Sequence, residues 1–235
     1  MRIKMNKSAL WCIPCVFFLT AAVLNLIGCV QGTALASTVK PALLPLLSAT
    51  CLAYLIGREY VDLRATALLV TAQLFGCVGD VLLIPDGFPF FASGIAAFLV
   101  GHIFYMCLFG GQSWRGLAVW QWAIALIVLG TALWFLVQFI GVEGPLFWPM
   151  LVYGFALMML IFSALAGVLR MPNGRRVTWW ILFLGALLFT FSDSCIAMDT
   201  FGTMTLPLHH FVVMFTYLAA QSLLAVGGIR LILGR

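Results

Sequence analysis

Long apolar runs alternate with short polar breaks along nearly the whole chain. Runs of roughly 17–25 apolar residues are long enough to cross a bilayer as helices. The pattern predicts eight such helices, at residues 9–30, 40–57, 65–84, 90–111, 117–140, 146–168, 178–198 and 208–230. The breaks are short and rich in proline and glycine, as in Pro85-Asp86-Gly87. Because no break has room for another domain, residues 1–235 are expected to form a single transmembrane domain.

The composition supports this all-α integral membrane bundle. Hydrophobic residues make up 64% of the 235 residues and charged residues only 8%, whereas a soluble domain carries about 25% charged residues. So few charges do not cover a water-facing surface. The net charge of +5 does not indicate nucleic acid as a partner, because the basic residues lie in short gaps between apolar runs.

The placement of lysine and arginine predicts how the bundle is oriented. With eight spans, eleven of the twelve basic residues fall on one side and only Lys40 falls on the other. Basic residues collect on the cytoplasmic side of membrane proteins. Both termini are therefore expected to be cytoplasmic, and the expected location is a bacterial inner membrane.

The first apolar run has a second interpretation, as a signal peptide. Arg2, Lys4 and Lys7 precede it, and Ala34-Leu35-Ala36 resembles a cleavage site. Against this, a run of about 20 apolar residues is long for the core of a signal peptide. An uncleaved first helix is the favoured expectation.

Two carboxylates, Asp80 and Asp193, lie inside predicted spans. A charged side chain at the bilayer centre costs about 2.5–3.5 kcal/mol on insertion scales, so its presence indicates a function. At a rise of about 1.5 Å per residue, both carboxylates fall roughly 6–10 Å below the outer boundary of the bilayer. Further polar residues lie within the predicted spans, mostly at similar or greater depth: Lys40, His102, Tyr105, Tyr153, Tyr217 and Gln221. The pattern predicts one polar cavity, open toward the extracytoplasmic side.

Simpler interpretations of these residues remain open. Asp80 could pair with Lys40 to hold two helices together, which does not exclude a catalytic role. Ser192 and Ser194 are expected to bond to helix carbonyls. His209 and His210 are expected to be interface residues at the outer end of the last span.

Two buried carboxylates in different surroundings can divide into an acid and a base. Such a pair suits hydrolysis through an oxocarbenium-like cation, since one group supplies a proton and the other stabilises positive charge or directs water. The chain has no Gly-x-Ser-x-Gly or His-Glu-x-x-His motif. A metal site built from Asp80, Asp193 and His102 is a minor alternative, and no cofactor is expected.

A series of motifs runs through these spans in a characteristic order. It comprises Lys40-Pro41, Gly79-Asp80, the stretch from Gly94 to Tyr105 that includes His102, Tyr153, Ser192-Asp193-Ser194, and Tyr217 with Gln221. Each motif alone is weak. Their order and spacing over nearly the whole chain resemble the lysoplasmalogenase-like (YhhN) family of multi-spanning membrane proteins.

The resemblance implies an enzyme that hydrolyses the vinyl ether bond of lysoplasmalogens. Its products would be a fatty aldehyde and glycerophosphoethanolamine or glycerophosphocholine, and its partners a lysophospholipid substrate and membrane lipid. On this hypothesis Asp80 and Asp193 are catalytic. The substrate-binding residues would be Lys40, His102, Tyr105, Tyr153, Tyr217 and Gln221.

Two other classes of function fit the same polar residues. A transporter or lipid-binding membrane protein also places charges inside its spans. However, the polar groups cluster toward one side and do not trace a path across the bilayer. A metal-dependent membrane lipid hydrolase is the other alternative.

Overall fold

The computed structural model describes residues 10–56, 58–140, 147–170, 173–201 and 206–234. These residues form eight helices and no β-strand. The helices are α1 (Cys12–Gln31), α2 (Leu35–Leu55), α3 (Leu63–Leu82), α4 (Phe88–Ser113), α5 (Val119–Ile140), α6 (Phe147–Arg170), α7 (Asn173–Thr200) and α8 (His209–Ile232). Each corresponds to one apolar run of the sequence, so the predicted all-helical architecture is confirmed.

Seven of the helices in the described part are long and apolar enough to span a membrane. Helix α5 is 22 residues long, and its sequence is also largely apolar. Many large apolar side chains on these helices are exposed, including Phe17, Ile127 and Trp148. An apolar exposed surface needs lipid around it. The chain is therefore an integral membrane protein.

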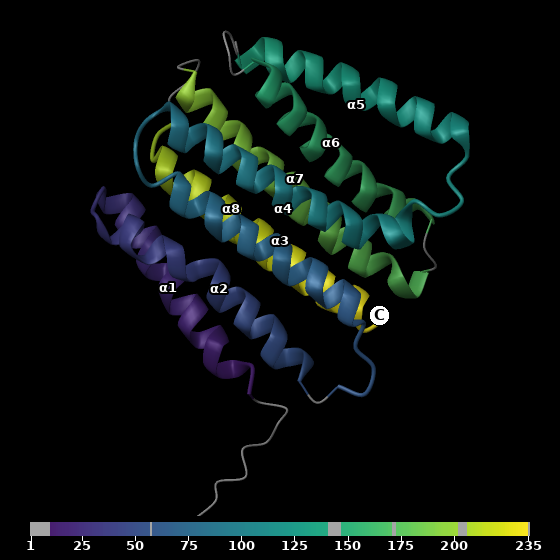
Figure 1. Cartoon of the computed structure of the whole chain (residues 1–235), viewed down its shortest axis with the longest axis horizontal. Coiled ribbons are helices and arrows are strands. Elements are labelled where there is room, and N and C mark those ends of the chain that lie inside the picture. The colour runs from purple at the N-terminus through teal and green to yellow at the C-terminus, as the bar shows by residue number, and fades with distance from the viewer. Residues whose placement is uncertain (1–9, 57, 141–146, 171–172, 202–205, 235) are drawn as a thin grey trace, which may run out of the picture.

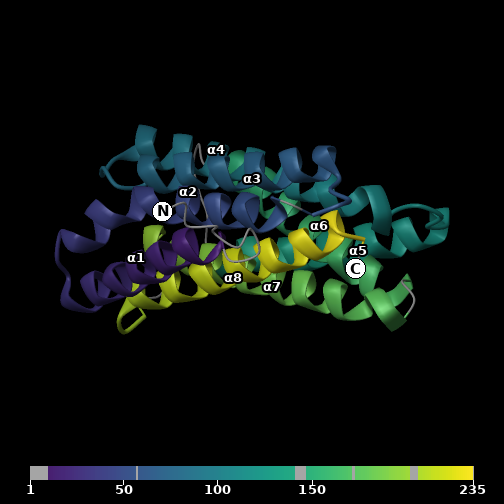
Figure 2. The ribbon, with the colours of Figure 1, turned by 90° about the horizontal axis from the view of Figure 1, so that it is seen from below.

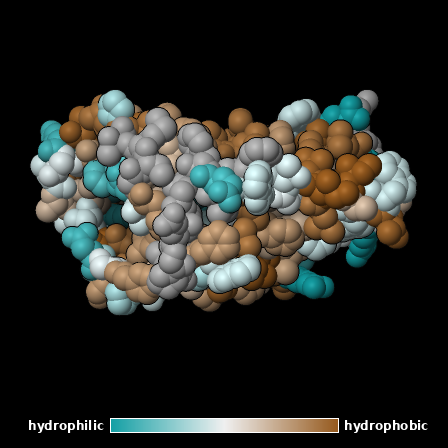
Figure 3. Space-filling view, turned by 90° about the horizontal axis from the view of Figure 1, so that it is seen from above, coloured by the Kyte–Doolittle hydropathy of each residue, from teal (hydrophilic) through white to brown (hydrophobic). Residues whose placement is uncertain are grey.

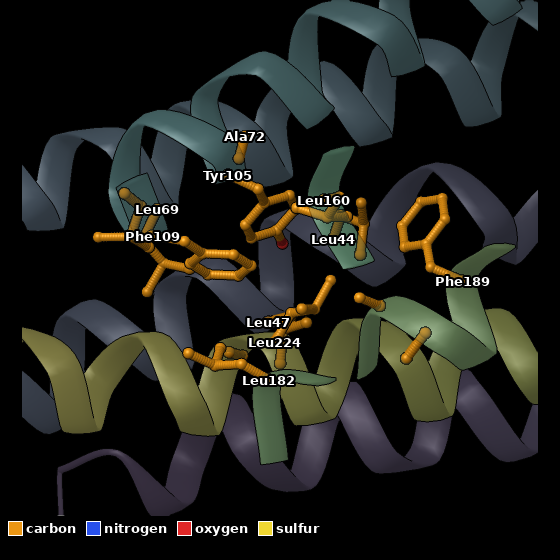
Figure 4. Packing of buried hydrophobic residues seen from close by; sticks show 14 of the residues in the cluster. Leu44, Leu47, Leu69, Ala72, Tyr105, Phe109, Leu160, Leu182, Phe189 and Leu224 are labelled. Carbon is orange, nitrogen blue, oxygen red and sulfur yellow. The ribbon is translucent and has the colours of Figure 1, made fainter. Parts of the chain in front are cut away.

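The helices pack as an elongated bundle (Figure 1). The closest neighbours are α7 with α8, α3 with α4, and α1 with α2. Helices α3 and α4 lie on one side of the bundle and α7 and α8 on the other (Figure 2). Helix α5 lies at the edge and packs chiefly on α6. Residues from most of the helices meet in one hydrophobic core, which includes Tyr105, Phe109, Phe189 and Leu224 (Figure 4).

Successive helices alternate in direction, so the bundle has two different ends. The end where α2, α4, α6 and α8 finish carries Arg58, Arg115, Arg170 and Arg230 and is called here the basic end. Lys40 lies in the second turn of α2 and so near the opposite end of the bundle. Hydrophilic side chains surround a hollow at that end (left in Figure 3). The predicted split of basic residues also used Arg2, Lys4, Lys7 and Arg235, which lie outside the described residues.

Helix α2 begins five residues earlier than predicted, at Leu35. Lys40, where the span was predicted to start, lies in the second turn of α2, and Pro41 and Pro45 both lie inside the helix. A proline lacks the N–H that would pair with the carbonyl four residues before it. Pro45 therefore leaves the Pro41 carbonyl free, and the Cys77 thiol of α3 donates a hydrogen bond to it at 3.4 Å. Such contacts from neighbouring helices let membrane helices tolerate internal proline.

Helices α3 and α4 approach closely because glycines line their contact. A Cβ atom on Gly79 would lie 2.7 Å from the ring of Phe98, which is too close. Small residues at such positions let membrane helices pack closely against their neighbours. Gly79 thus brings the neighbouring residue Asp80 close to α4 and the core.

Candidate functional site

Asp80 lies in the last turn of α3, with 2% of its surface exposed. Lys40 of α2 places its Nζ 3.5 Å from Oδ1 of Asp80. Tyr217 of α8 donates a hydrogen bond from its hydroxyl to Oδ2 at 2.7 Å. Both carboxylate oxygens therefore have a partner, and three helices meet at this side chain. The predicted pairing of Asp80 with Lys40 is confirmed.

Asp193 of α7 is partly buried and forms a second carboxylate centre. The hydroxyl of Tyr153, on α6, donates a hydrogen bond to Oδ2 of Asp193. The two adjacent serines bond to helix carbonyls, as the sequence predicts. Ser194 donates to a carbonyl of its own helix at 2.7 Å, and Ser192 donates to the Val213 carbonyl of α8 at 3.0 Å.

Three aromatic rings lie between the Asp80 and Asp193 centres. The rings of Phe98, Phe189 and Tyr217 contact one another edge to face, with centroids 5.5–6.3 Å apart. The site therefore holds two carboxylates, each bonded to a tyrosine hydroxyl, on either side of an apolar aromatic wall.

His102 of α4 lies against this wall and is 1% exposed. Its ring contacts Phe189 at 4.6 Å and Tyr153 at 5.5 Å between centroids. Neither ring nitrogen has a hydrogen-bond partner within the described part of the chain. A buried polar group without a partner is costly and uncommon. The Phe98 carbonyl, one turn earlier on α4, lies near the ring without a hydrogen bond of good geometry.

Tyr105 and Gln221 form a deeper polar pair. The Tyr105 hydroxyl donates to Oε1 of Gln221 at 2.7 Å, and both side chains are 1% exposed. Gly76 of α3 lies against this pair, since an added Cβ would lie 3.4 Å from Nε2 of Gln221 and 3.5 Å from the Tyr217 hydroxyl. The polar interior therefore extends from Asp80 toward the middle of the bundle.

A cavity of about 490 Å³, lined mainly by residues of α1, α2, α7 and α8 and of the segment between α3 and α4, lies at the end opposite the basic end and is called here the vestibule. Lys40 lines it, so this lysine contacts both the cavity and the Asp80 carboxylate. Other polar and charged residues around the vestibule include Asn25, Asp86, Asp199, His209 and His210. The two histidines predicted to be interface residues thus lie at its rim, where Nε2 of His209 is 3.6 Å from Oδ2 of Asp199. The hollow in Figure 3 lies at this end of the molecule.

A second, much smaller cavity of about 20 Å³ lies beside Asp193. Tyr153 and Asp193 supply its polar groups, and the other walls are apolar side chains of α3, α4, α6 and α7. It shares Leu83, Phe91 and Ile196 with the vestibule. These three apolar side chains therefore separate the Asp193 centre from the polar vestibule.

The described residues contain no group of three or more His, Cys, Asp or Glu side chains that could hold a metal ion. The minor alternative of a site from Asp80, Asp193 and His102 thus finds no support in the geometry. The polar groups present are two carboxylates, tyrosine hydroxyls, one ammonium group and one imidazole. That set is suited to proton transfer and to stabilising charge.

Comparison with known proteins decides the family. The model of the YhhN family matches residues 35–228, from the start of α2 to near the end of α8. The chain belongs to the YhhN family. No solved structure matches this chain significantly.

Relatives of this YhhN protein include several named lysoplasmalogenases. Lysoplasmalogenase TMEM86B of Homo sapiens is 34% identical over 191 residues, covering 80% of this chain and 75% of the relative. Lysoplasmalogenase TMEM86B of Mus musculus is 34% identical over 168 residues, covering 71% and 65%. Lysoplasmalogenase TMEM86A of Bos taurus is 30% identical over 178 residues, covering 76% and 71%.

The predicted site residues of this YhhN protein fall into two groups, which are Lys40, Tyr105, Tyr217 and Gln221 near Asp80, and His102 and Tyr153 near Asp193. Sequence reasoning missed the apolar residues Phe98 and Phe189, whose rings separate the two centres. It also missed a buried bond from the Ser48 hydroxyl to Oε1 of Gln73, at 2.8 Å. A polar residue inside an apolar run is a visible signal, so Gln73 could have been found. An aromatic residue in such a run carries no comparable signal.

Proposed function

We propose that the protein is a lysoplasmalogenase-type hydrolase that cleaves the vinyl ether bond of lysoplasmalogens inside the membrane. The proposal rests on the two carboxylates, each bonded to a tyrosine hydroxyl, beneath an open vestibule. The activity named for its relatives agrees with this chemistry. The products would be a fatty aldehyde and glycerophosphoethanolamine or glycerophosphocholine.

The substrate would place its phosphate in the vestibule, beside the ammonium group of Lys40. The glycerol then reaches down past Asp80. The vinyl ether would reach Asp193 past Leu83, Phe91 and Ile196, so these side chains must move apart when the substrate binds, and the alkenyl chain would then lie along the apolar walls beside Asp193. His102, Tyr105 and Gln221 would line the remaining polar interior. This pose keeps the charged head in the hydrophilic part of the site and the chain in its apolar part.

The partners of the two carboxylates suggest a division of labour. Asp80 already has a cationic partner in Lys40, which suits an ionised carboxylate that stabilises positive charge and accepts a proton from water. Asp193 has a hydroxyl partner and apolar surroundings, which suits a neutral acid.

The reaction then balances in three steps. Asp193 donates its proton to the vinyl carbon that is not bonded to the ether oxygen, which leaves an oxocarbenium ion. Water adds to that ion and gives a proton to Asp80, which forms a hemiacetal. The hemiacetal then loses its hydroxyl proton to Asp193 and takes the proton of Asp80 onto the glycerol oxygen, which releases aldehyde and alcohol.

Aldehyde release by the purified protein in detergent tests the proposal. A transporter breaks no bond in its substrate and so would release no aldehyde, and a detergent micelle holds no gradient to transport against. The wild type is expected to release aldehyde from a lysoplasmalogen and none from the analogue whose chain is joined by a saturated ether. Aldehyde from neither lipid would overturn the proposed reaction.

Single substitutions test the two carboxylates. We expect Asp80→Asn and Asp193→Asn each to lower turnover about a hundredfold or more, the range for loss of an acid or base. Glu59→Gln, which alters an exposed carboxylate at the basic end, is the control and should keep wild-type turnover. Near wild-type turnover by a folded Asp80→Asn or Asp193→Asn variant would remove that residue from the mechanism.

A further inference from the structure

A groove of about 430 Å³ lies at the basic end, far along the same helices from the vestibule. Three helices form it, and each contributes one face. The walls are Trp11 before α1, Cys15, Phe18 and Leu19 of α1, Leu47, Thr50, Cys51 and Tyr54 of α2, and Ser222, Ala225, Val226, Ile229, Arg230 and Leu233 in and after α8. These residues recur at intervals of three and four, so the groove follows the helix axes.

The shape and walls of the groove suit a hydrocarbon chain. From Ser222 to Leu233 it runs about 16 Å at the rise of an α-helix. Its lining is largely apolar, and all three helices are long and apolar enough to span the membrane. Water in such a groove would hydrate apolar walls, which is unfavourable. A chain from the surrounding lipid has no such cost.

Positive charge surrounds the mouth of the groove. Arg230 lines the groove, and its Nε donates to the Thr178 hydroxyl at 2.9 Å. The Arg58 guanidinium lies 4.4 Å from the ring centre of Tyr54, which also lines the groove. Neither ion pair found in the described part of the chain involves an arginine.

The two acidic residues nearest in sequence, Glu59 and Asp62, form no ion pair with Arg58 or Arg230 in the described part of the chain. Glu59 is exposed, in the loop that follows α2. The carboxylate of Asp62 accepts a hydrogen bond from the Ala65 N–H and so caps α3. The mouth of the groove is therefore complementary to an anionic head group.

We propose that this groove binds one anionic phospholipid from the leaflet at the basic end. One acyl chain fills the groove between α1 and α8, and the phosphate group lies at Arg230. The lipid fastens α1 to α8, the helix that also carries Tyr217 and Gln221. This site does not depend on the proposed reaction, and its test measures stability and bound lipid, not turnover.

The first test compares two lipids with the same acyl chains. The full-length protein in detergent is heated with phosphatidylglycerol or with phosphatidylcholine, and retained lipid is counted by native mass spectrometry. Binding to the folded state alone raises its stability. We expect phosphatidylglycerol to raise the unfolding midpoint by several degrees more than phosphatidylcholine, with one lipid retained. Equal shifts for the two lipids would overturn the proposal.

The second test fills the groove. Val226→Trp places a large ring in the groove from a side chain that is 50% exposed. Val128→Trp makes the same change on α5 at a side chain that is 59% exposed and distant from the groove. We expect Val226→Trp to lose the phosphatidylglycerol shift and the retained lipid, and Val128→Trp to keep both. A Val226→Trp protein with the full wild-type shift would overturn the site.

Three further variants complete the test. Ser222→Leu fills the same groove and replaces Val226→Trp if that variant does not fold. Among the described residues, the Ser222 hydroxyl bonds only to a carbonyl of its own helix, so its loss should leave the packing between helices intact.

Arg230→Gln should bring the phosphatidylglycerol shift down to the phosphatidylcholine value. Arg115→Gln, at the same end but outside the groove lining, should preserve the difference. If Arg230→Gln also preserved it, the head-group assignment would be wrong.

Discussion

At the scale of single residues, the buried carboxylate of Asp80 is stable because it is fully partnered. An unpaired charge in a membrane interior is costly, and pairing with good hydrogen bonds offsets that cost. Lys40 and Tyr217 supply one partner for each oxygen. The same contacts hold the carboxylate in one orientation, which a catalytic group requires.

Loss of the tyrosine hydroxyl should slow the reaction without unfolding the protein. Hydrogen bonds to charged groups contribute about 1.5–3 kcal/mol, so Tyr217→Phe should lower turnover about ten- to a hundredfold. The measurement is the rate of aldehyde release at saturating lysoplasmalogen. Tyr60→Phe is the control, since Tyr60 is 84% exposed. Equal rates for the two variants would show that the bond to Asp80 does not support catalysis.

The Lys40–Asp80 pair should behave as one unit in stability measurements. Removing one member of a buried pair costs about 3–5 kcal/mol, and the partly exposed Lys40 points to the lower end of that range. We expect Lys40→Met and Asp80→Asn each to lower the unfolding free energy in detergent. The double variant should lose less than the sum, by about 0.5–3 kcal/mol. Additive losses would contradict direct coupling of the two side chains.

At the scale of elements, glycine positions determine how closely helices approach. Gly79 faces the Phe98 ring of α4, while Gly130 of α5 has no atom within 4 Å of an added Cβ. Both glycines lie in helices of the same membrane bundle. The two positions therefore allow the same substitution to be compared in crowded and open surroundings.

We expect Gly79→Ala and Gly130→Ala to change stability in opposite directions. Overpacking costs about 1–3 kcal/mol, so Gly79→Ala should lower the unfolding free energy. Alanine favours helix by up to about 1 kcal/mol over glycine, so Gly130→Ala should leave that free energy unchanged or raise it. Thermal unfolding in detergent measures both. Equal effects of the two substitutions would contradict the close packing of α3 on α4.

At the scale of the whole molecule, charge is distributed unequally between the two ends of the bundle. All seven arginines of the described residues lie at the basic end, and the vestibule end carries Lys40 with Asp86 and Asp199. Lysine and arginine in short loops set the orientation of membrane proteins. The basic end is therefore expected to face the cytoplasm.

Reporter fusions in a bacterial host test this orientation. A fluorescent protein joined after the C-terminus should fluoresce in the cytoplasm. Alkaline phosphatase inserted after Gly87, in the loop between α3 and α4, should be active because that loop faces outward. The reverse pattern would show that the vestibule opens to the cytoplasm.

The sequence by itself determined the helices, because the length of an apolar run follows directly from the thickness of the bilayer. It also singled out Asp80 and Asp193, because a charge inside such a run is conspicuous. It placed the start of α2 too late, because the contact that makes Pro45 tolerable comes from Cys77 on another helix.

Only the tertiary structure decided which groups meet. Tyr217 pairs with Asp80 across 137 positions of the chain, and Tyr153 pairs with Asp193 across 40. The sequence offered several tyrosines of similar depth for either carboxylate. The choice depends on which helices pack together and how each is rotated, and neither is encoded in the hydrophobicity of a single span. The vestibule and the groove likewise exist only once helices from distant parts of the chain enclose them.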